Sequence, residues 1–472
     1  MRPGIDLAGK RVLVVGLART GMVTSLFAAG YGAAVTATDE KSEAELGGET
    51  VAKLRAAGVS LMLGGQIPGA FLDQDLIVVS PGVPAHIPGI DLARANHIPV
   101  WSEIELAWRF LRGKVIAITG SNGKTTTTSL VAHILKNAGI ETLLGGNIGT
   151  PLLALVERST DSSVTVAEIS SFQLETVEAF RPEIGVLLNL TPDHLDRHAT
   201  FDEYAAAKMR MFENQTERDF AVLNADDPAV TGRMPAKPHI FWFSRLKRVA
   251  AGAYVRDDQI FFRNEGSETA VARCDEIPLL GQHNVENVLA ACAAAHLAGA
   301  IPSAIGAGVR TFKAVEHRLE FVAEIGGVKF YNDSKATNVD ATIKAIEAFS
   351  GPLFVILGGK DKGSDYIPLR EPLRARAGKA LLVGAAADKI AEHLGDAVPI
   401  ERSGTIERAV QAAIAGAKPG DVVLLTPACA SFDQFENYEH RGRVFKEIVA
   451  RAAAESAAAE DSGAGGSAKK RG

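Results

Sequence analysis

A glycine-rich segment that ends in lysine and threonine is the part of the sequence with the clearest chemical meaning. It follows an apolar stretch, residues 115–119, and consists of Gly120-Ser121-Asn122-Gly123-Lys124-Thr125-Thr126. Glycines let backbone N–H groups turn towards a triphosphate, a lysine ammonium can bind the β and γ phosphates, and a threonine hydroxyl can bind Mg²⁺. The segment therefore predicts a phosphate-binding loop between a strand and a helix, and with it the use of ATP or GTP.

One position departs from the usual form of such loops. The pattern G-x-x-x-x-G-K-[ST] places a glycine where this chain has Ile118, so we expect Gly120 to anchor the loop instead. A glycine-rich turn with an incidental lysine is the alternative. The order of strand, turn and helix favours the phosphate loop.

Two further apolar stretches end in side chains that bind metal ions. Residues 164–167 are followed by Glu168, and residues 185–188 are followed by a turn that contains Asp193 and His194. Carboxylates at the end of a strand beside a phosphate loop hold Mg²⁺ in many nucleotide-binding enzymes. The residues leave the alternatives open, because Glu168 could be a plain acid at a strand end and Asp193 a helix cap.

Lys208 lies in residues 201–208, which we expect to be helical, with Tyr204 one turn before it. By composition Lys208 is a solvated surface lysine. Nothing in the spacing singles it out.

The amino-terminal segment 12–21 resembles a dinucleotide-binding turn, but only in part. That fingerprint needs glycine at positions 16, 18 and 21, and this chain has Ala18 in the middle. A methyl group there hinders the close approach of a pyrophosphate, so we do not expect NAD. The loop can still present the start of a helix to a diphosphate.

These loops need a scaffold, and apolar stretches that alternate with helical ones predict it. We expect an α/β protein with parallel sheets and three domains: a Rossmann-like amino-terminal domain, a central P-loop ATPase-type domain and a Rossmann-like carboxyl-terminal domain. The predicted bounds are 1–112, 113–313 and 314–451. Residues 452–472, rich in alanine, serine, glycine and glutamate, are predicted to be a disordered tail.

Composition narrows the class of protein. The chain has 472 residues, 47% of them hydrophobic and 22% charged, with a net charge of −6. This balance excludes wholesale disorder and argues against a protein that coats nucleic acid. The 3 cysteines indicate neither a disulfide framework nor a zinc site. We see no signal peptide and no apolar stretch of about 20 residues, so we expect a cytoplasmic protein.

Taken together, the motifs resemble those of the ATP-dependent Mur ligases. The resemblance covers nearly the whole chain in the right order, and it is carried by the phosphate loop and by the segments 168–174 (EISSFQL), 189–194 (NLTPDH), 281–284 (GQHN), 332–338 (NDSKATN) and 427–435 (PACASFDQF). It implies a sugar-nucleotide domain, an ATPase domain and an amino-acid domain, in that order.

The resemblance also assigns roles to residues. For catalysis it implies Lys124, Glu168, His194, Lys208 and Lys335. For ATP it implies residues 120–126 (Gly120, Ser121, Asn122, Gly123, Lys124, Thr125 and Thr126) with Asn284, Asn287, Arg318 and Asp333. One or two Mg²⁺ ions would lie at Thr125, Glu168, His194 and Lys208, the lysine carrying CO₂ as a carbamate. For the UDP-sugar it implies Gly16, Arg19, Thr20, Asp39, Ser80, Gly82 and Asn147, and for D-glutamate Thr337, Lys362, Ser431 and Tyr438.

The implied reaction is amide ligation in peptidoglycan precursor synthesis. ATP would phosphorylate the L-alanyl carboxylate of UDP-N-acetylmuramoyl-L-alanine, and the amine of D-glutamate would attack the acyl phosphate while closure of the third domain excludes water. We expect these small molecules as partners, a monomer, and neither nucleic acid nor membrane.

Two alternatives remain. A Mur or folylpolyglutamate-type ligase with another acceptor is disfavoured by residues 333–338 and by Lys362. A P-loop switch or kinase would need no amine and no third domain.

Overall fold

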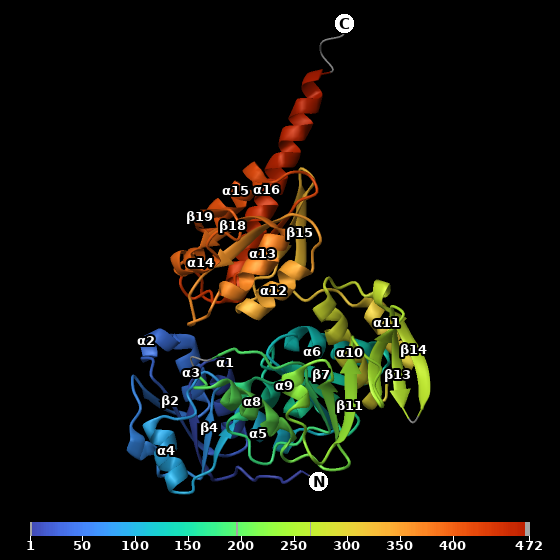
Figure 1. The fold of residues 1–472 in the computed structure, drawn as a ribbon. Helices are drawn as coiled ribbons and strands as arrows, with labels where there is room; N and C mark the ends of the chain where they lie inside the picture. Colours follow the sequence, from blue (N-terminus) through green and yellow to red (C-terminus); the bar gives the residue numbers. More distant parts are fainter. Residues whose placement is uncertain (1, 195–196, 265, 468–472) are drawn as a thin grey trace. The chain divides into compact units, whose positions relative to one another are not determined.

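The computed structural model describes residues 2–194, 197–264 and 266–467 (Figure 1). The chain forms two compact units. The first contains residues 2–192, the described part of 197–276, and 286–312; the second contains 193–194, 277–285 and 313–467. Three sheets account for the strands of these units, two in the first and one in the second.

The amino-terminal sheet is parallel, with strand order β3-β2-β1-β4-β5. Alternate residues of β1 pack into different cores, Val12 and Val14 into one and Leu13 and Val15 into the other. Both faces are therefore covered, as expected for a parallel sheet. The strands are β1 (Arg11–Val15), β2 (Ala34–Asp39), β3 (Ser60–Leu63), β4 (Leu76–Val79) and β5 (Val100–Ser102), and the helices are α1 (Arg19–Gly30), α2 (Glu43–Leu46), α3 (Gly48–Ala56), α4 (Pro88–Ala95) and α5 (Glu103–Phe110).

The central sheet has the order β14-β13-β12-β11-β10-β9-β6-β8-β7, parallel from β7 to β12 and antiparallel beyond. Its strands are β6 (Lys114–Thr119), β7 (Thr142–Gly146), β8 (Val164–Glu168), β9 (Ile184–Leu187), β10 (Phe220–Asn224), β11 (His239–Ser244), β12 (Gly252–Arg256), β13 (Gln259–Asn264) and β14 (Ser267–Arg273). The helices are α6 (Lys124–Asn137), α7 (Ser171–Leu174), α8 (Phe201–Met209), α9 (Pro228–Thr231), α10 (Gln282–Leu297) and α11 (Pro302–Thr311).

Helix α5 joins these two sheets through buried glutamates. One Glu105 oxygen accepts hydrogen bonds from the backbone N–H groups of residues 178–180. Glu103 accepts one from the N–H of Leu153 at 2.7 Å. Because Val14 of the first sheet and Ala117 of the second belong to the same core, the first unit is a continuous body.

The third sheet, in the second unit, has the order β15-β16-β20-β17-β18-β19, with only the β15–β16 pair antiparallel. Helices α12 to α14 pack on one face and α15 and α16 on the other. The strands are β15 (Glu320–Ile325), β16 (Val328–Asn332), β17 (Leu353–Gly358), β18 (Ala377–Val383), β19 (Ile400–Gly404) and β20 (Val422–Leu425), and the helices are α12 (Val339–Glu347), α13 (Arg370–Arg376), α14 (Ala387–Leu394), α15 (Ile406–Gly416) and α16 (Tyr438–Ser467).

The α/β class with parallel-rich sheets is confirmed, and the tail that begins at residue 452 stays a prediction. Helix α16 continues to Ser467. Alanine and glutamate, frequent in this stretch, favour helix. Residues 468–472 lie outside the described residues. The three domain bounds stay a prediction. No helix in the described parts of the chain is long and apolar enough to cross a bilayer.

Candidate active site

The predicted phosphate loop connects β6 to α6, as the sequence indicates. Gly120 and Gly123 have positive φ angles, 153° and 85°. A Cβ atom on Gly123 would lie 2.1 Å from Oδ1 of Asn287, so only glycine fits against that side chain. Asn287, implied at the adenine by the resemblance, therefore contacts the phosphate loop itself. Ile118, at the place of the missing glycine, is a fully buried strand residue paired with Glu168.

The loop is held by polar side chains on the segment that follows β9. Asn189 accepts from the N–H of Asn122 at 2.8 Å and donates to its carbonyl at 3.1 Å. The Ser121 hydroxyl donates to the carbonyl of Thr191 at 2.9 Å. The Lys124 ammonium donates to the carbonyls of Gly120 and Ser121, both at 2.8 Å. These hydrogen bonds hold the loop in shape, and they keep the Lys124 ammonium against the carbonyls of the loop itself.

Thr125 and Glu168 form the core of the predicted metal site. The Thr125 hydroxyl donates to one Glu168 oxygen at 2.7 Å, and the Asn147 amide donates to the other at 2.8 Å. Glu168 is 1% exposed. A hydroxyl and a carboxylate at the end of a strand are ligands that suit Mg²⁺. The structure therefore brings Asn147, implied for the sugar nucleotide, to this acid. His194 lies in the second unit, where it is 3.7 Å from Asp193, and its role at the metal stays a prediction.

Lys208 is the clearest disagreement with composition. Its side chain is not solvated: the residue is 1% exposed, and its Nζ donates to the carbonyl of Gly120 at 3.0 Å. The ammonium also lies 4.5 Å from the centre of the Tyr204 ring, and the Tyr204 hydroxyl donates to Ser121 at 3.0 Å. Positions 204 and 208 are one helical turn apart, so both side chains of α8 face the phosphate loop.

Two residues at this site were missed by the sequence analysis. His198 is buried, its Nε2 lies 3.1 Å from the Ser171 hydroxyl, and its ring stacks on Phe172. The Arg197 guanidinium lies over the Phe172 ring, 4.4 Å from its centre, and donates to the carbonyls of Gly82 and Val83. Arg197 thus connects the central domain to the amino-terminal loops. The phenylalanine at position 172, within a polar segment, was the feature of the sequence that could have indicated this group of side chains.

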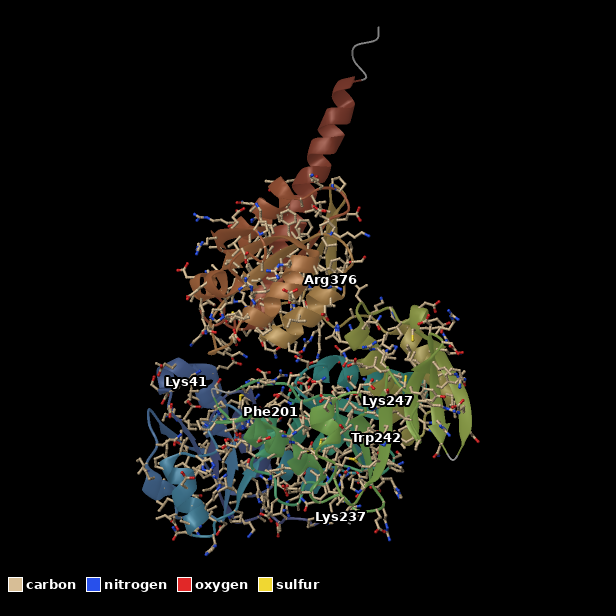
Figure 2. All side chains as sticks on the ribbon, viewed as in Figure 1. Lys41, Phe201, Lys237, Trp242, Lys247 and Arg376 are labelled. Atoms are coloured by element: carbon tan, nitrogen blue, oxygen red, sulfur yellow. The ribbon has the colours of Figure 1, made fainter. Side chains whose placement is uncertain are left out.

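A pocket of about 410 Å³ lies at the carboxyl ends of β1, β2 and β4. Of the residues implied for the UDP-sugar, four line it: Gly16, Asp39, Ser80 and Gly82. Lys41, labelled in Figure 2, lines it as well.

The turn beside this pocket is tightly constrained. Asp39 accepts from the N–H of Leu17 at 2.5 Å, and the Ser80 hydroxyl donates to the Gly16 carbonyl at 2.7 Å. A Cβ on Gly21 would lie 1.7 Å from that carbonyl oxygen, which explains the glycine. Arg19 and Thr20 lie in the first turn of α1, outside the set of residues that line the pocket.

In the second unit, the residues implied for D-glutamate follow neighbouring parallel strands. The loop after β17 and the segment after β20 are joined by a two-way backbone bridge between Lys360 and Ala430, with N···O distances of 2.9 and 3.2 Å. Ser431 is buried next to this bridge, and Lys335 lies 5.1 Å from the Tyr438 ring. Thr337 follows Ala336, whose carbonyl accepts from the N–H of residue 428. Lys362 lies 3.6 Å from Asp193.

Arg441, also missed, supports this region from α16. Its guanidinium is buried and donates to the Ser334 hydroxyl and to the carbonyls of Ser334, Cys429 and Ala430. It therefore ties together the segments that carry Lys335 and Ser431. The sequence shows only an arginine one turn into the last helix. This does not reveal that the arginine is buried, because its burial depends on the tertiary structure.

The remaining residues implied for ATP lie in two places. Asn284, in the first turn of α10, donates to the Leu280 carbonyl at 2.7 Å. Asp333 is buried after β16 and accepts from the N–H of Leu319 at 3.3 Å. Burial raises the pKa of Asp333 to about 7, against the attraction of the Arg318 guanidinium. Asp333 and Arg318 are thus close enough to interact.

The sequence matches known families along most of its length. A model described as Mur ligase MurD-like, N-terminal domain matches residues 10–102; one described as Mur ligase middle domain matches 118–295; one described as Mur ligase, glutamate ligase domain matches 317–429.

Curated relatives agree. A UDP-N-acetylmuramoylalanine–D-glutamate ligase from Koribacter versatilis is 54% identical over 95% of this chain and 99% of its own length. A protein of the same name from Acidobacterium capsulatum is 54% identical over 94% and 97%.

Solved structures show the same fold at low sequence identity. A pseudomurein peptide ligase type C from Methanothermus fervidus is 21% identical, with a TM-score of 0.59 over 94% of this chain and 100% of that one. The MurF ligase from Thermotoga maritima, solved in complex with ADP, is 18% identical with a TM-score of 0.58 over 94% and 96%. With family models that cover all three sheets, the chain belongs to the Mur ligase family.

Proposed function

We propose that this protein is the ATP-dependent ligase that joins D-glutamate to UDP-N-acetylmuramoyl-L-alanine, a step in peptidoglycan precursor synthesis. The observation that carries the proposal is the match to D-glutamate ligases at 54% identity over 95% of the chain. The geometry supports the general chemistry, because a shaped phosphate loop, a metal-binding pair and a set of cationic side chains are present. The similarity selects the two substrates.

The chemical problem is that a carboxylate is a poor electrophile at neutral pH. Transfer of the γ-phosphate of ATP to the L-alanyl carboxylate forms an acyl phosphate, whose phosphate can leave. Lys124 and the N–H groups at the start of α6 stabilise the negative charge on the transferred group. Thr125 and Glu168 would hold Mg²⁺, with His194 as a further ligand, and the ion supplies neutralisation of phosphate charge.

Lys208 would carry a carbamate in the active enzyme. The Lys208 ammonium first loses one proton. The neutral amine then attacks the carbon of CO₂, a C–N bond forms as one C–O π bond breaks, and a second proton leaves, so that a cation becomes an anion. The burial of Lys208 supports this, because it holds the amine beside the phosphate loop and away from bulk water. Its place beside Gly120 would put the new oxygens near the phosphate loop, where a second Mg²⁺ is also proposed.

The acceptor half of the site would use the second unit. Lys362 would pair with the side-chain carboxylate of D-glutamate, Lys335 would lie near the phosphates and the acceptor, and Thr337, Ser431 and Tyr438 would complete the contacts. The amine of D-glutamate then attacks the acyl carbon, a C–N bond forms, and phosphate leaves with the electron pair of the C–O bond.

We further propose that the enzyme acts as a monomer in the cytoplasm on small molecules, with neither nucleic acid nor membrane as a partner. The net charge of −6, with both signs spread along the chain, supports the proposal that nucleic acid is not a partner. Sedimentation equilibrium across a range of concentrations tests the monomer.

The direct test measures phosphate release with ATP and UDP-N-acetylmuramoyl-L-alanine, with and without D-glutamate, while mass spectrometry follows the joined product. We expect release to depend on D-glutamate and to match product one to one. Replacing D-glutamate by L-glutamate, D-alanine or a diamino acid decides between this ligase and a relative with another acceptor. Equal ATP consumption without D-glutamate, and no product, would overturn the proposal.

A further inference from the structure

Asp361 stands out in the loop that carries Lys362, because three groups hold its carboxylate. Lys389 of α14 donates to one oxygen at 2.7 Å. The other oxygen accepts from the Tyr366 hydroxyl at 2.7 Å and from the N–H of Ser364 at 3.1 Å. Burial alone would raise the pKa of Asp361, but these hydrogen bonds outweigh it and hold the pKa below its usual value.

Tyr366 is the fixed point of this cluster. Its side chain is completely buried, its hydroxyl also lies 3.0 Å from the Cys429 sulfur, and its N–H donates to His393 at 3.1 Å. A buried tyrosine whose side-chain hydroxyl and backbone N–H are both hydrogen-bonded does not move easily. Asp361 therefore fastens the far side of the loop to α14, while the bridge from Lys360 to Ala430 fastens the near side to the segment that carries Ser431.

The charge of Asp361 matters as much as its position. It is the immediate neighbour of Lys362, which is proposed to bind a carboxylate of the acceptor. An uncompensated carboxylate there would repel a dicarboxylic amino acid and would compete for the Lys362 ammonium. The Lys389 ammonium neutralises it at 2.7 Å, so that the Lys362 ammonium stays available to a carboxylate of the acceptor.

We propose that Lys389 and Tyr366, acting through Asp361, are positioning residues that make the Lys362 loop selective for an acceptor with a second carboxylate. Neither Lys389 nor Tyr366 needs to touch the substrate. The inference rests on the proposed function, since it concerns how the D-glutamate site of that reaction is kept positive and in place.

The test compares Lys389→Met, Asp361→Asn and the double variant with the wild type in the full ligase assay. Methionine keeps the length of the lysine stem and removes the charge. We expect Lys389→Met to raise the KM for D-glutamate about tenfold, as for one charge lost beside a partly exposed anion, with kcat and the KM for ATP changed less than about twofold. The double variant, which has no unpaired carboxylate, should recover most of the lost affinity.

Lys379→Met is the matched control, because it removes a similarly exposed ion pair, Lys379 to Glu401 at 3.0 Å, from another part of the same sheet. Two results would overturn the proposal: a KM for D-glutamate no higher in Lys389→Met than in this control, or a double variant no better than Lys389→Met. The second would mean that Lys389 acts directly or only on stability.

Failure of the proposed function shows in a different measurement, the absence of D-glutamate turnover by the wild type. In that case the same ratios of KM are measured with whichever acidic amino acid is accepted. If no acidic amino acid is accepted, the inference is overturned together with the proposed function.

Discussion

The phosphate region of the first unit and the acceptor region of the second are built on one plan, with loops at the carboxyl ends of parallel strands, yet they hold their functional side chains differently. Glu168 and Lys208 are each 1% exposed. Each is hydrogen-bonded to a residue of the phosphate loop, Glu168 to Thr125 and Lys208 to Gly120. Of the residues implied for the acceptor, Thr337, Lys362 and Tyr438 are half-buried and only Ser431 is buried, while the buried Arg441 holds the loops. Nucleotide chemistry needs fixed groups, whereas choosing an amino acid needs groups that remain accessible to it.

The largest effect is expected at the phosphate loop. Lys124→Ala should lower product formation about a thousandfold, because it removes the ammonium of the phosphate loop itself, which stabilises the charge on the transferred phosphate. Affinity for the UDP-substrate, measured by calorimetry, should stay within about twofold, since the pocket proposed for it lies on another sheet. Activity above a few per cent of wild type would contradict the role given to this lysine.

Lys208→Ala comes next, with an expected loss of about a hundredfold from the missing anion at the metal site. Short carboxylic acids such as acetate should restore part of the activity, because they can supply the oxygens of the carbamate. Lys237→Ala, at an exposed lysine labelled in Figure 2, is the control and should neither lose activity nor respond to acetate. A lack of rescue would refute the carbamate while leaving the fold untouched.

Lys208 also shows where reasoning from the sequence reaches its limit. The strands could be found: the predicted apolar stretches 115–119, 164–167 and 185–188 match β6, β8 and β9 to within one residue at each end, because each is a compact apolar stretch next to a turn. The strands β7 and β10 were missed, since glycines or a polar end interrupt their apolar pattern. Composition assigned Lys208 to the surface, because most lysines are solvated. That prediction failed because the burial of this lysine depends on residues that are distant in the sequence, such as Gly120.

The site follows the same rule. The phosphate loop was predictable because glycine, lysine and threonine act there as local neighbours in the chain. Arg441 and Asp361 were not, because each works by joining segments that are distant in the sequence: Arg441 reaches Ser334, and Asp361 reaches Lys389. A single sequence carries the first kind of information in its order and the second only in its fold.

In the acceptor region a smaller, more specific effect is expected. Lys362→Met should raise the KM for D-glutamate about thirtyfold through the loss of one charged hydrogen bond, with kcat changed much less. Lys360→Met, at an exposed neighbour in the same loop, is the control, because its contribution to the loop is the backbone bridge. If kcat fell as much as it does in Lys124→Ala, the contrast between the two regions would disappear.

The smallest effect concerns stability and uses one buried carboxyl group in each unit. Burial raises the pKa of Glu103 from 4.5 to about 7 and that of Asp333 from 3.8 to about 7. A folded-state pKa above the unfolded value means that the folded protein binds more protons, so each group lowers the free energy of unfolding as the pH rises from about 4 to about 7. The size is about 3 kcal/mol at most for Glu103 and about 4 kcal/mol at most for Asp333.

Glu103→Gln should therefore flatten the pH dependence of unfolding for the first unit, and Asp333→Asn that of the second, both measured by denaturant titration between about pH 5 and 8. The two variants should differ in activity. Glu103 accepts a hydrogen bond from the Leu153 backbone and has a role in packing α5, so its amide should keep near-normal turnover. Asp333 lies beside Arg318 on the proposed ATP site, so its amide should raise the KM for ATP. An equal rise in the KM for ATP in both variants would show that burial of a carboxyl group serves the same purpose in both units.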